Sequence, residues 1–309
     1  MTLLLVVSAL ASRMSKTGFG FNGAARRRQL SLLMAIVLLP AHTALCASPT
    51  QASSSRSTRN SAAKAIPLAK LDPADRAEVA AVVKNTSIFR RMPVQVTDCD
   101  PHLYLFLVQH PEVIVDIWQV MGISKVQLER TGENTFAADD GSGTTGTIKV
   151  CYASQDTHVF LAEGSYQGPL SERLLKAKCV LVLKSGYVQE TSRRWYVTSR
   201  LDAFIQMDNV GLELVAKTFQ PLINKSADFN FAETAGFVSH VSKTAESNPA
   251  GMARLANKLD GIDEPTREEL IELSNQVAQR AAERKTQAQL ARTRTPGGRS
   301  QAPSKKPAG

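Results

Sequence analysis

Between residues 126 and 205, apolar residues alternate with polar ones in short segments that are separated by Gly, Pro, Asn, Asp or Ser. A hydrophobic period of two is typical of β-strands, and turn residues between such segments indicate tight reversals of the chain. This region therefore predicts an antiparallel meander. The expected strands are residues 126–130, 134–136, 147–152, 158–164, 177–184 and 194–205.

The last expected strand indicates how the sheet is covered. One of its faces is apolar and the other is largely polar, so we expect helices to cover the sheet on one side only. The apolar face carries Trp195, Val197, Ser199, Leu201, Ala203 and Ile205, and the polar face carries Tyr196, Thr198, Arg200 and Asp202.

Before the meander, the sequence predicts three short helices and one strand. Asp72-Pro73 opens the first helix, because Asp can cap a helix and Pro is tolerated at its first position. A strand at 92–97 and helices at 102–109 and 112–121 follow, and Gly122 suits the left-handed cap that ends the last of them.

After the meander, the period becomes helical again. Residues 210–223 carry Leu212, Val215, Phe219 and Leu222 at helical spacing, and Pro221 is expected to kink this helix before it resumes to about residue 245. Further amphipathic helices are expected over residues 248–284. The fold class is therefore α+β: a curved antiparallel sheet gripping a long C-terminal helix, with extra helices after it.

This order of elements resembles the helix-grip proteins, the START-like or SRPBCC superfamily of lipid-transfer proteins and polyketide cyclases. The resemblance covers roughly residues 88–245, within an expected domain of residues 71–247, and it concerns the order of elements. The matching stretches are 100–121 for a helix pair, 126–205 for the strands and 210–245 for the closing helix. The Pro221 kink and the helices after Asn248 depart from the family pattern.

The resemblance implies a cavity between sheet and helix that holds an apolar ligand. Its walls would include Trp195, Val197 and Leu201 from the last strand and Val215 and Phe219 from the helix. Arg194 or Arg200 would pair with a head group at the rim. For any single one of these apolar residues, an ordinary packed core is the favoured interpretation over the wall of a pocket.

The formal charge of +9 is unevenly distributed along the chain. All 28 Asp and Glu lie between residues 71 and 283, where they outnumber Lys and Arg, whereas both ends of the chain are purely basic. Nucleic-acid binding needs basic residues clustered on a folded surface. The charge pattern therefore argues against a specific nucleic-acid partner.

The N-terminus has the pattern of an export signal. Arg26–Arg28 precede the apolar stretch 30–39, and Ala44-Leu45-Cys46 offers a cleavage site before Ala47. We expect a signal over residues 1–46, with Met14 as the true start, and an exported protein, periplasmic or secreted. The alternatives are an uncleaved signal that holds the protein at the membrane and a lipid anchor on Cys46. Residues 47–70 are expected to form a flexible linker and 285–309 a basic disordered tail.

No spacing of residues indicates a catalytic or metal site, and no cofactor is predicted. Asp139–Gly143 is expected to form a hairpin turn rather than a calcium loop. His158 lies near Asp156 and is expected at an exposed strand entry, with a general base as the alternative.

Three cysteines follow the expected cleavage site: Cys99, Cys151 and Cys179. Cys151 and Cys179 lie on nearby expected strands, so a disulfide between them is one interpretation in an oxidising compartment. The other interpretation is that all three are buried thiols.

The favoured function is an exported, non-enzymatic protein that binds a lipid or other hydrophobic molecule. One alternative is a protein partner bound through helices at residues 249–289, where Leu270, Leu273, Val277 and Ala281 form a stripe near heptad spacing. That stripe suits packing against the chain's own domain equally well. A cyclase or hydrolase using Asp139, Asp140 or His158 is a further alternative.

Overall fold

The computed structural model describes residues 50–168, 171–207 and 220–294, and these form one antiparallel sheet with helices on both of its faces. The strand order is β1-β8-β7-β6-β5-β4-β3, and β2 also pairs with β8. The meander predicted from the alternating segments is therefore confirmed. The strands are β1 (Ile88–Arg91), β2 (Gln95–Asp98), β3 (Gln127–Gly132), β4 (Thr135–Asp139), β5 (Thr144–Ala153), β6 (Thr157–Gly168), β7 (Ser171–Gln189) and β8 (Trp195–Met207).

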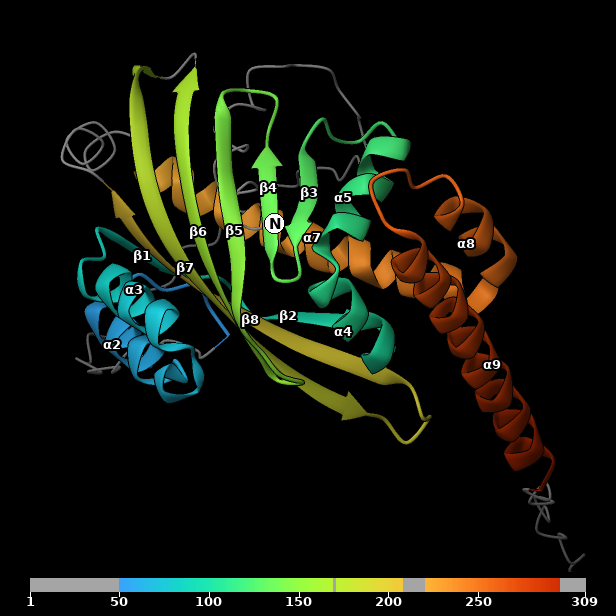
Figure 1. Ribbon diagram of the computed structural model, residues 1–309. Coiled ribbons are helices and arrows are strands. Elements are labelled where there is room, and N and C mark those ends of the chain that lie inside the picture. The colour runs from blue at the N-terminus through green and yellow to red at the C-terminus, as the bar shows by residue number, and fades with distance from the viewer. Residues whose placement is uncertain (1–49, 169–170, 208–219, 295–309) are drawn as a thin grey trace, which may run out of the picture.

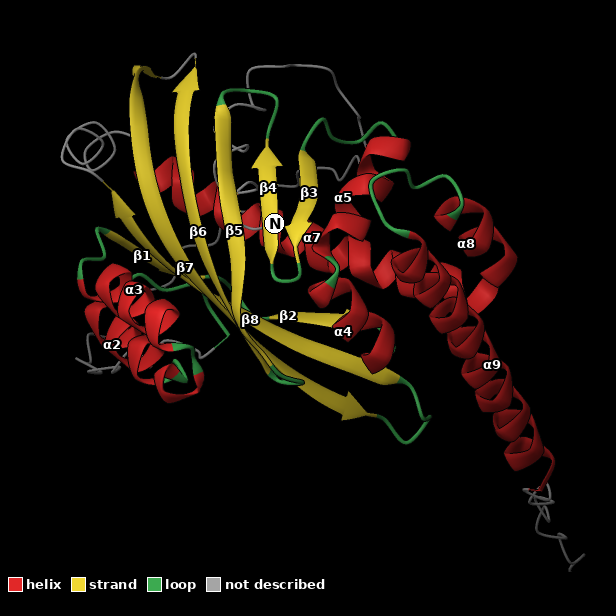
Figure 2. Ribbon diagram, viewed as in Figure 1, coloured by secondary structure: helices red, strands yellow, loops and turns green. Residues whose placement is uncertain are grey.

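The long helix α7 (Gln220–Ser247) lies across one face of the curved sheet, as Figures 1 and 2 show. Helices α4 and α5 lie beside the sheet next to β2 and β3, and the C-terminal helices follow α7. The predicted α+β class is confirmed. The other helices are α2 (Arg56–Lys64), η1 (Leu68–Lys70), α3 (Pro73–Lys84), α4 (Pro101–Gln109), α5 (Pro111–Val120), α8 (Pro249–Ala256) and α9 (Glu264–Arg294).

The helix pair α4–α5 begins and ends where the sequence predicts. The Asp100 side chain accepts hydrogen bonds from the backbone N–H groups of His102 and Leu103, which caps α4, and Pro101 occupies its first turn. Gly122 follows α5 with a φ of 68°, the left-handed conformation that favours glycine. Local chemistry is therefore sufficient to set both helix boundaries.

Two hydrophobic layers lie on opposite faces of the sheet. The larger layer joins the inner face to α4, α5, α7, α8 and α9. The smaller layer packs α2 and α3 against the outer face, where Phe204 of β8 lies 5.0 Å from the ring of Phe89. The prediction that helices cover one side only is therefore wrong at this end of the sheet, because β8 carries apolar residues on both faces beyond Leu201.

Helix α2 and the short η1 lie within the flexible linker expected over residues 47–70. Ser55 caps α2, and Ala62, Ile66 and Leu71 are buried in the smaller layer. The mostly polar residues 51–61 precede these few apolar ones, which is why the composition suggests a linker. Likewise, α9 continues to Arg294, so the first part of the expected tail at 285–309 is helical.

The C-terminal helices fold back onto the domain. Leu270, Val277 and Ala281 of α9 are buried, and Leu273 packs against the same core. Arg280 donates to the Asp100 carboxylate at 2.9 Å, and Arg284 donates to Glu246 of α7. The stripe therefore packs against the chain's own domain. The alternative that residues 249–289 bind a protein partner depended on a free stripe and is no longer supported by it.

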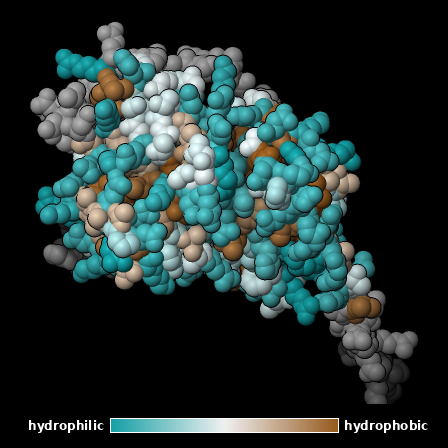
Figure 3. Space-filling model, viewed as in Figure 1, coloured by the Kyte–Doolittle hydropathy of each residue, from teal (hydrophilic) through white to brown (hydrophobic). Residues whose placement is uncertain are grey.

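Figure 3 shows that hydrophilic side chains cover most of the face seen in Figure 1, with hydrophobic atoms visible in recesses between them. Within the part of the chain that the structure describes, no helix is both long and apolar enough to span a membrane.

Several predictions fall on residues that the structure leaves undescribed. They concern the signal over 1–46, the start at Met14, the anchor residue Cys46 and the last residues of the tail. Val215 and Phe219 also lie outside the described residues. Pro221 lies in the first described turn of α7, and the segment that would show a kink precedes it, so the kink stays a prediction.

Candidate functional site

An internal cavity of about 90 Å³ lies between the inner face of the sheet and α7. Every described residue that lines it is uncharged, and most are aliphatic or aromatic. The lining residues are Thr97, Tyr104, Leu107, Val108, Pro111, Ile114, Leu128, Phe136, Ile148, Phe160, Leu181, Leu183, Ser199, Leu201, Phe231, Thr234, Ala235 and Val238.

The floor of the cavity follows from the alternation of the strands. Phe136 of β4 pairs with Ile148 of β5, and Phe160 of β6 pairs with Leu181 of β7. Residues that pair across antiparallel strands point to the same face, so these side chains meet on the inner side. One continuous apolar floor therefore runs across at least five strands.

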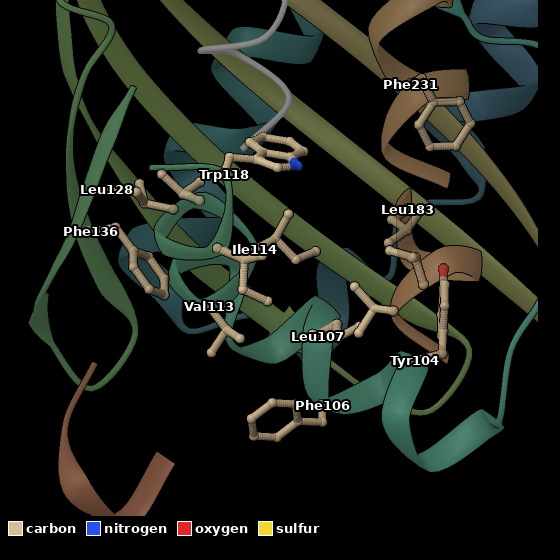
Figure 4. Packing of buried hydrophobic residues seen from close by; sticks show 14 of the residues in the cluster. Tyr104, Phe106, Leu107, Val113, Ile114, Trp118, Leu128, Phe136, Leu183 and Phe231 are labelled. Atoms are coloured by element: carbon tan, nitrogen blue, oxygen red, sulfur yellow. The ribbon is translucent and has the colours of Figure 1, made fainter. Parts of the chain in front are cut away.

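The opposite wall is helical. Phe231, Thr234, Ala235 and Val238 line the cavity from α7 at the spacing of one helix face, and Ile114 contributes from α5. Figure 4 shows Phe231 on the same side of the cluster as Leu183 and Tyr104. The cavity is thus closed by the helix that crosses the sheet.

Four of the lining residues carry hydroxyl groups. The Tyr104 hydroxyl lies 2.9 Å from Ser185 Oγ, and burial raises the pKa of Tyr104 to about 12. The Thr234 hydroxyl donates to the Asn230 carbonyl at 2.8 Å. The Ser199 hydroxyl, which also lines the cavity, lowers the pKa of Tyr104 and so opposes the effect of burial in part. Thr97 Oγ1 is buried and has no partner among the described residues.

Of the cavity residues expected from the sequence, the structure places Leu201 in the lining. Val197 is fully buried in the same hydrophobic layer but does not line the cavity. Trp195 lines a separate polar hollow of about 140 Å³ with Asp100, Arg193 and Arg280, near the beginning of β8. The expected face of β8 is therefore right, but the cavity contacts only its middle.

The two arginines expected at the rim of the cavity interact with carboxylates elsewhere. Arg194 donates to Asp98 at 2.9 Å, and this hydrogen bond raises the pKa of Arg194. Arg200 lies on the opposite face of β8 from Leu201, with its Nε 3.9 Å from the Asp202 carboxylate. Neither arginine lines the cavity, so the expected pairing with a ligand head group is not found there.

His158 is buried, with 1% of its surface exposed, so the expectation of an exposed strand entry is wrong. The reason is that β6 is an interior strand, and the His158 ring stacks near Phe160. Both ring nitrogens lack a partner among the described residues. Burial lowers the pKa of His158 to about 4, and nearby Asp156 opposes this shift only in part.

Asp139 and Asp140 stabilise the hairpin turn that the sequence predicts. Asp140 Oδ1 accepts from the backbone N–H groups of Ser142 and Thr144, and Asp139 Oδ1 accepts from Gly141. Neither carboxylate lines the cavity, and His158 does not line it either, so the cavity gives no support to a cyclase or hydrolase that uses these three residues. Within the described ranges, no group of three or more His, Cys, Asp or Glu is arranged to hold a metal ion.

The three described cysteines are free thiols, so the proposed disulfide between Cys151 and Cys179 is wrong. Strand β6 lies between β5, which carries Cys151, and β7, which carries Cys179. The two residues also belong to different hydrophobic layers, on opposite faces of the sheet. Burial raises the pKa of both thiols to about 12.

The cavity-lining residues that the sequence does not predict lie on the inward-facing sides of β2, α4 and β4–β7. Thr97, Tyr104 and Phe136 all occur in segments whose periodicity was recognised. Their common cavity follows only from the order of strands in the sheet, because that order brings residues from distant segments together.

No protein-family model and no curated protein matches this sequence. Among solved structures, a conserved protein from Geobacillus kaustophilus is 13% identical, with a TM-score of 0.28 over 46% of this chain and 93% of that one. The protein Ara h 8.0201 is 9% identical, with a TM-score of 0.29 over 48% and 97%. The di-domain ARO/CYC BexL from the BE-7585A biosynthetic pathway is 15% identical, with a TM-score of 0.32 over 54% and 56%.

At these identities and scores, the assignment of the fold depends on the chain's own topology. The antiparallel meander, the return of β8 beside β1 and β2, and the long helix across the inner face are all present. The chain therefore has the helix-grip fold of START-like proteins, as the order of its elements predicted.

Proposed function

We propose that this protein is an exported binding protein that holds a hydrophobic molecule between the sheet and α7. The observation that supports it is the cavity, which interrupts an otherwise packed core. Ligand sites are typically concave and mostly apolar, with a few placed polar groups. The described lining fits this pattern, because it combines aliphatic and aromatic side chains with a small number of hydroxyls.

The size of the cavity sets a condition on binding. A cavity of about 150 Å³ is enough to hold benzene in a protein core. The cavity between the sheet and α7 measures about 90 Å³, so a ligand of the size of benzene or larger requires its wall to move. The side chain best placed to move is Phe231, which comes from α7 and closes one side of the cavity.

Binding is favoured over catalysis by the chemistry of the lining. General acid–base and nucleophilic catalysis need groups such as His, Asp, Glu, Cys or Lys beside the reacting atoms. None of these types occurs among the described lining residues, where Tyr104 is the one ionisable side chain and burial raises its pKa to about 12. The Ser and Thr hydroxyls have no such group among the described lining residues to activate them. Affinity would then come from the burial of apolar surface.

The export part of the proposal is supported by the N-terminal sequence. A basic cluster, an apolar stretch and a small-residue cleavage site precede Ala47 in the order of a secretory signal. The first backbone hydrogen bonds to the folded domain come soon after this site. Val94 donates to the Thr50 carbonyl, and Ser53 forms a β-bridge with Arg91. Cleavage before Ala47 would therefore leave the folded part intact.

A substitution that fills the cavity tests the binding proposal. Ala235 lines the cavity from α7, so Ala235→Phe is expected to occupy it. The neighbouring Gly236→Ala is the matched control, since its added Cβ meets no atom within 4 Å. Ethylbenzene is expected to bind the wild type and Gly236→Ala equally by calorimetric titration, and to bind Ala235→Phe at least tenfold more weakly. Equal binding to all three would overturn the cavity as the site.

Mass analysis of the mature protein tests export. After expression of the full chain in a host that secretes proteins, the N-terminus is expected at Ala47. An intact N-terminus on protein found in the membrane fraction would favour the retained anchor instead. An intact N-terminus on protein inside the cell would contradict export.

A further inference from the structure

The Thr97 side chain points into the cavity from β2. Its neighbour Val96 is 66% exposed, whereas Thr97 is 2% exposed, as expected for successive residues on opposite faces of a strand. Thr97 pairs with Val197 of β8, and both side chains are buried on the inner side. The position of Thr97 is therefore fixed by the pairing of two strands.

The Thr97 hydroxyl is an unusual group in this position, because its oxygen is buried and has no partner among the described residues. Buried polar groups in proteins almost always have a hydrogen-bond partner, and an unpaired one destabilises the fold. Thr234 provides a contrast within the same cavity, because its hydroxyl already donates to the Asn230 carbonyl. Thr97 thus has an unused donor and acceptor that face the cavity.

Other hydroxyls lie close to Thr97. Ser199 of β8 is buried beside it on the inner face, where the neighbouring β2 residue Gln95 pairs with Ser199. Tyr104 contacts both Ser185 and Ser199. Of these residues, Thr97, Tyr104 and Ser199 line the cavity, whereas Ser185 is the hydrogen-bond partner of Tyr104 and does not line it.

The same lining excludes an ionised ligand group. A carboxylate or phosphate moved from water into a site without a cation is strongly destabilised. No Lys, Arg or His is among the described residues that line the cavity. A neutral hydroxyl matches the site better, because it can both donate to and accept from Thr97.

From this arrangement, and on the basis of the proposed function, we propose that the ligand is an uncharged hydrophobic alcohol or phenol. Its hydroxyl binds Thr97 Oγ1, and its hydrocarbon part occupies the space between Phe136, Leu183 and Phe231. The inference narrows the ligand class from hydrophobic molecules in general to neutral ones with a hydroxyl at one end.

Three probes that share the ethylbenzene frame and differ in one para substituent test this inference: ethylbenzene, 4-ethylphenol and 4-ethylbenzoate. Calorimetric titration of the wild type is expected to show 4-ethylphenol binding about tenfold more tightly than ethylbenzene, the difference typical of one satisfied buried hydrogen bond. The anionic 4-ethylbenzoate is expected to bind more weakly than both. These comparisons require no substitution and so do not depend on the folding of a variant.

Variants then locate the effect. Thr97→Val keeps the branched shape and removes the hydroxyl, so it should lose about tenfold in affinity for 4-ethylphenol and none for ethylbenzene. Thr97→Ser should retain the preference for the phenol. Thr234→Val is the control within the same cavity, and it should leave the preference unchanged because the Thr234 hydroxyl is already used.

The outcomes separate this inference from the proposed function. If ethylbenzene binds and 4-ethylphenol binds no more tightly, the Thr97 hydroxyl does not bind the hydroxyl of the ligand. The inference is then overturned, while the proposed binding function stands. If the phenol preference persists in Thr97→Val, the hydroxyl binds elsewhere and the inference is also overturned. If none of the probes binds, the proposed function itself fails.

Discussion

Phe229 and Phe231 lie two residues apart on α7 and have opposite environments. The Phe231 side chain lines the cavity and is 8% exposed, whereas Phe229 is 62% exposed. This pair therefore offers the same chemical change at a cavity position and at a surface position of one helix.

We expect Phe231→Ala to enlarge the cavity and to lower the free energy of unfolding by about 3 kcal/mol, as is usual for the loss of a buried aromatic ring. The enlarged cavity should then bind two-ring hydrocarbons such as naphthalene more tightly than the wild type does. Urea denaturation and probe titration measure the two effects. Phe229→Ala should change the free energy of unfolding by about 0.5 kcal/mol or less. An equal loss in both variants would show that Phe231 does not close the cavity.

His158 should make stability depend on pH. Its pKa is lowered from 6.5 to about 4 in the folded protein, so the unfolded chain binds the proton more readily between these values. The contribution of neutral His158 to the free energy of unfolding is therefore fully present above about pH 6.5. It is lost as the pH falls through 4, and the total loss is about 3 kcal/mol. Urea denaturation at pH 7 and pH 4.5 measures this change.

The matched variant for this prediction is His158→Leu, which cannot bind a proton. The difference between wild type and variant isolates the contribution of His158 from that of the carboxylates. Asp116 contributes with the opposite sign, because burial raises the pKa of its carboxyl. If the wild type and His158→Leu lose the same free energy between the two pH values, His158 is not buried in its neutral form.

Helix α9 should contribute to the stability of the domain through its buried stripe. Leu270 is fully buried against the core, so Leu270→Ala should lower the free energy of unfolding by about 3 kcal/mol. Leu290 on the same helix is exposed, and Leu290→Ala should have an effect of about 0.5 kcal/mol or less. A negligible effect of Leu270→Ala would instead restore the hypothesis that α9 binds another protein.

The three described cysteines should be free in the purified protein. Alkylation of the unfolded, non-reduced chain should modify Cys99, Cys151 and Cys179, and the folded protein should react slowly because the thiols are buried or half-buried. Peptide mapping by mass spectrometry gives the count. A mass consistent with a single modified thiol would indicate a disulfide and would contradict the strand order.

Much of this fold follows from local pattern. The strands of the meander are visible because alternation reports directly on burial of one face, and α4 and α5 are visible because Asp100, Pro101 and Gly122 set their ends. Helix α2 was missed for a physical reason. Its composition is strongly polar, and only a few apolar residues hold it against a second face of the sheet.

The candidate site was harder to predict than the fold. Alternation placed Leu201 correctly on the inner face, but it could not show where along β8 the cavity lies. That position depends on where α7 crosses the sheet, and Trp195 lies instead in a different hollow that is lined in part by α9. The Cys151–Cys179 pair shows the same limit, since only the strand order reveals that β6 separates them.

Methyl NMR with ethylbenzene tests the central claim most directly. In protein labelled at Leu, Val and Ile methyl groups, the bound ring is expected to give intermolecular nuclear Overhauser effects to Leu183, Leu201 and Val238, which line the cavity from β7, β8 and α7. Val96 is exposed on the outer side of β2 and should show none. Contacts confined to surface methyl groups, or the absence of any contact at the solubility limit of the probe, would contradict a ligand cavity between the sheet and α7.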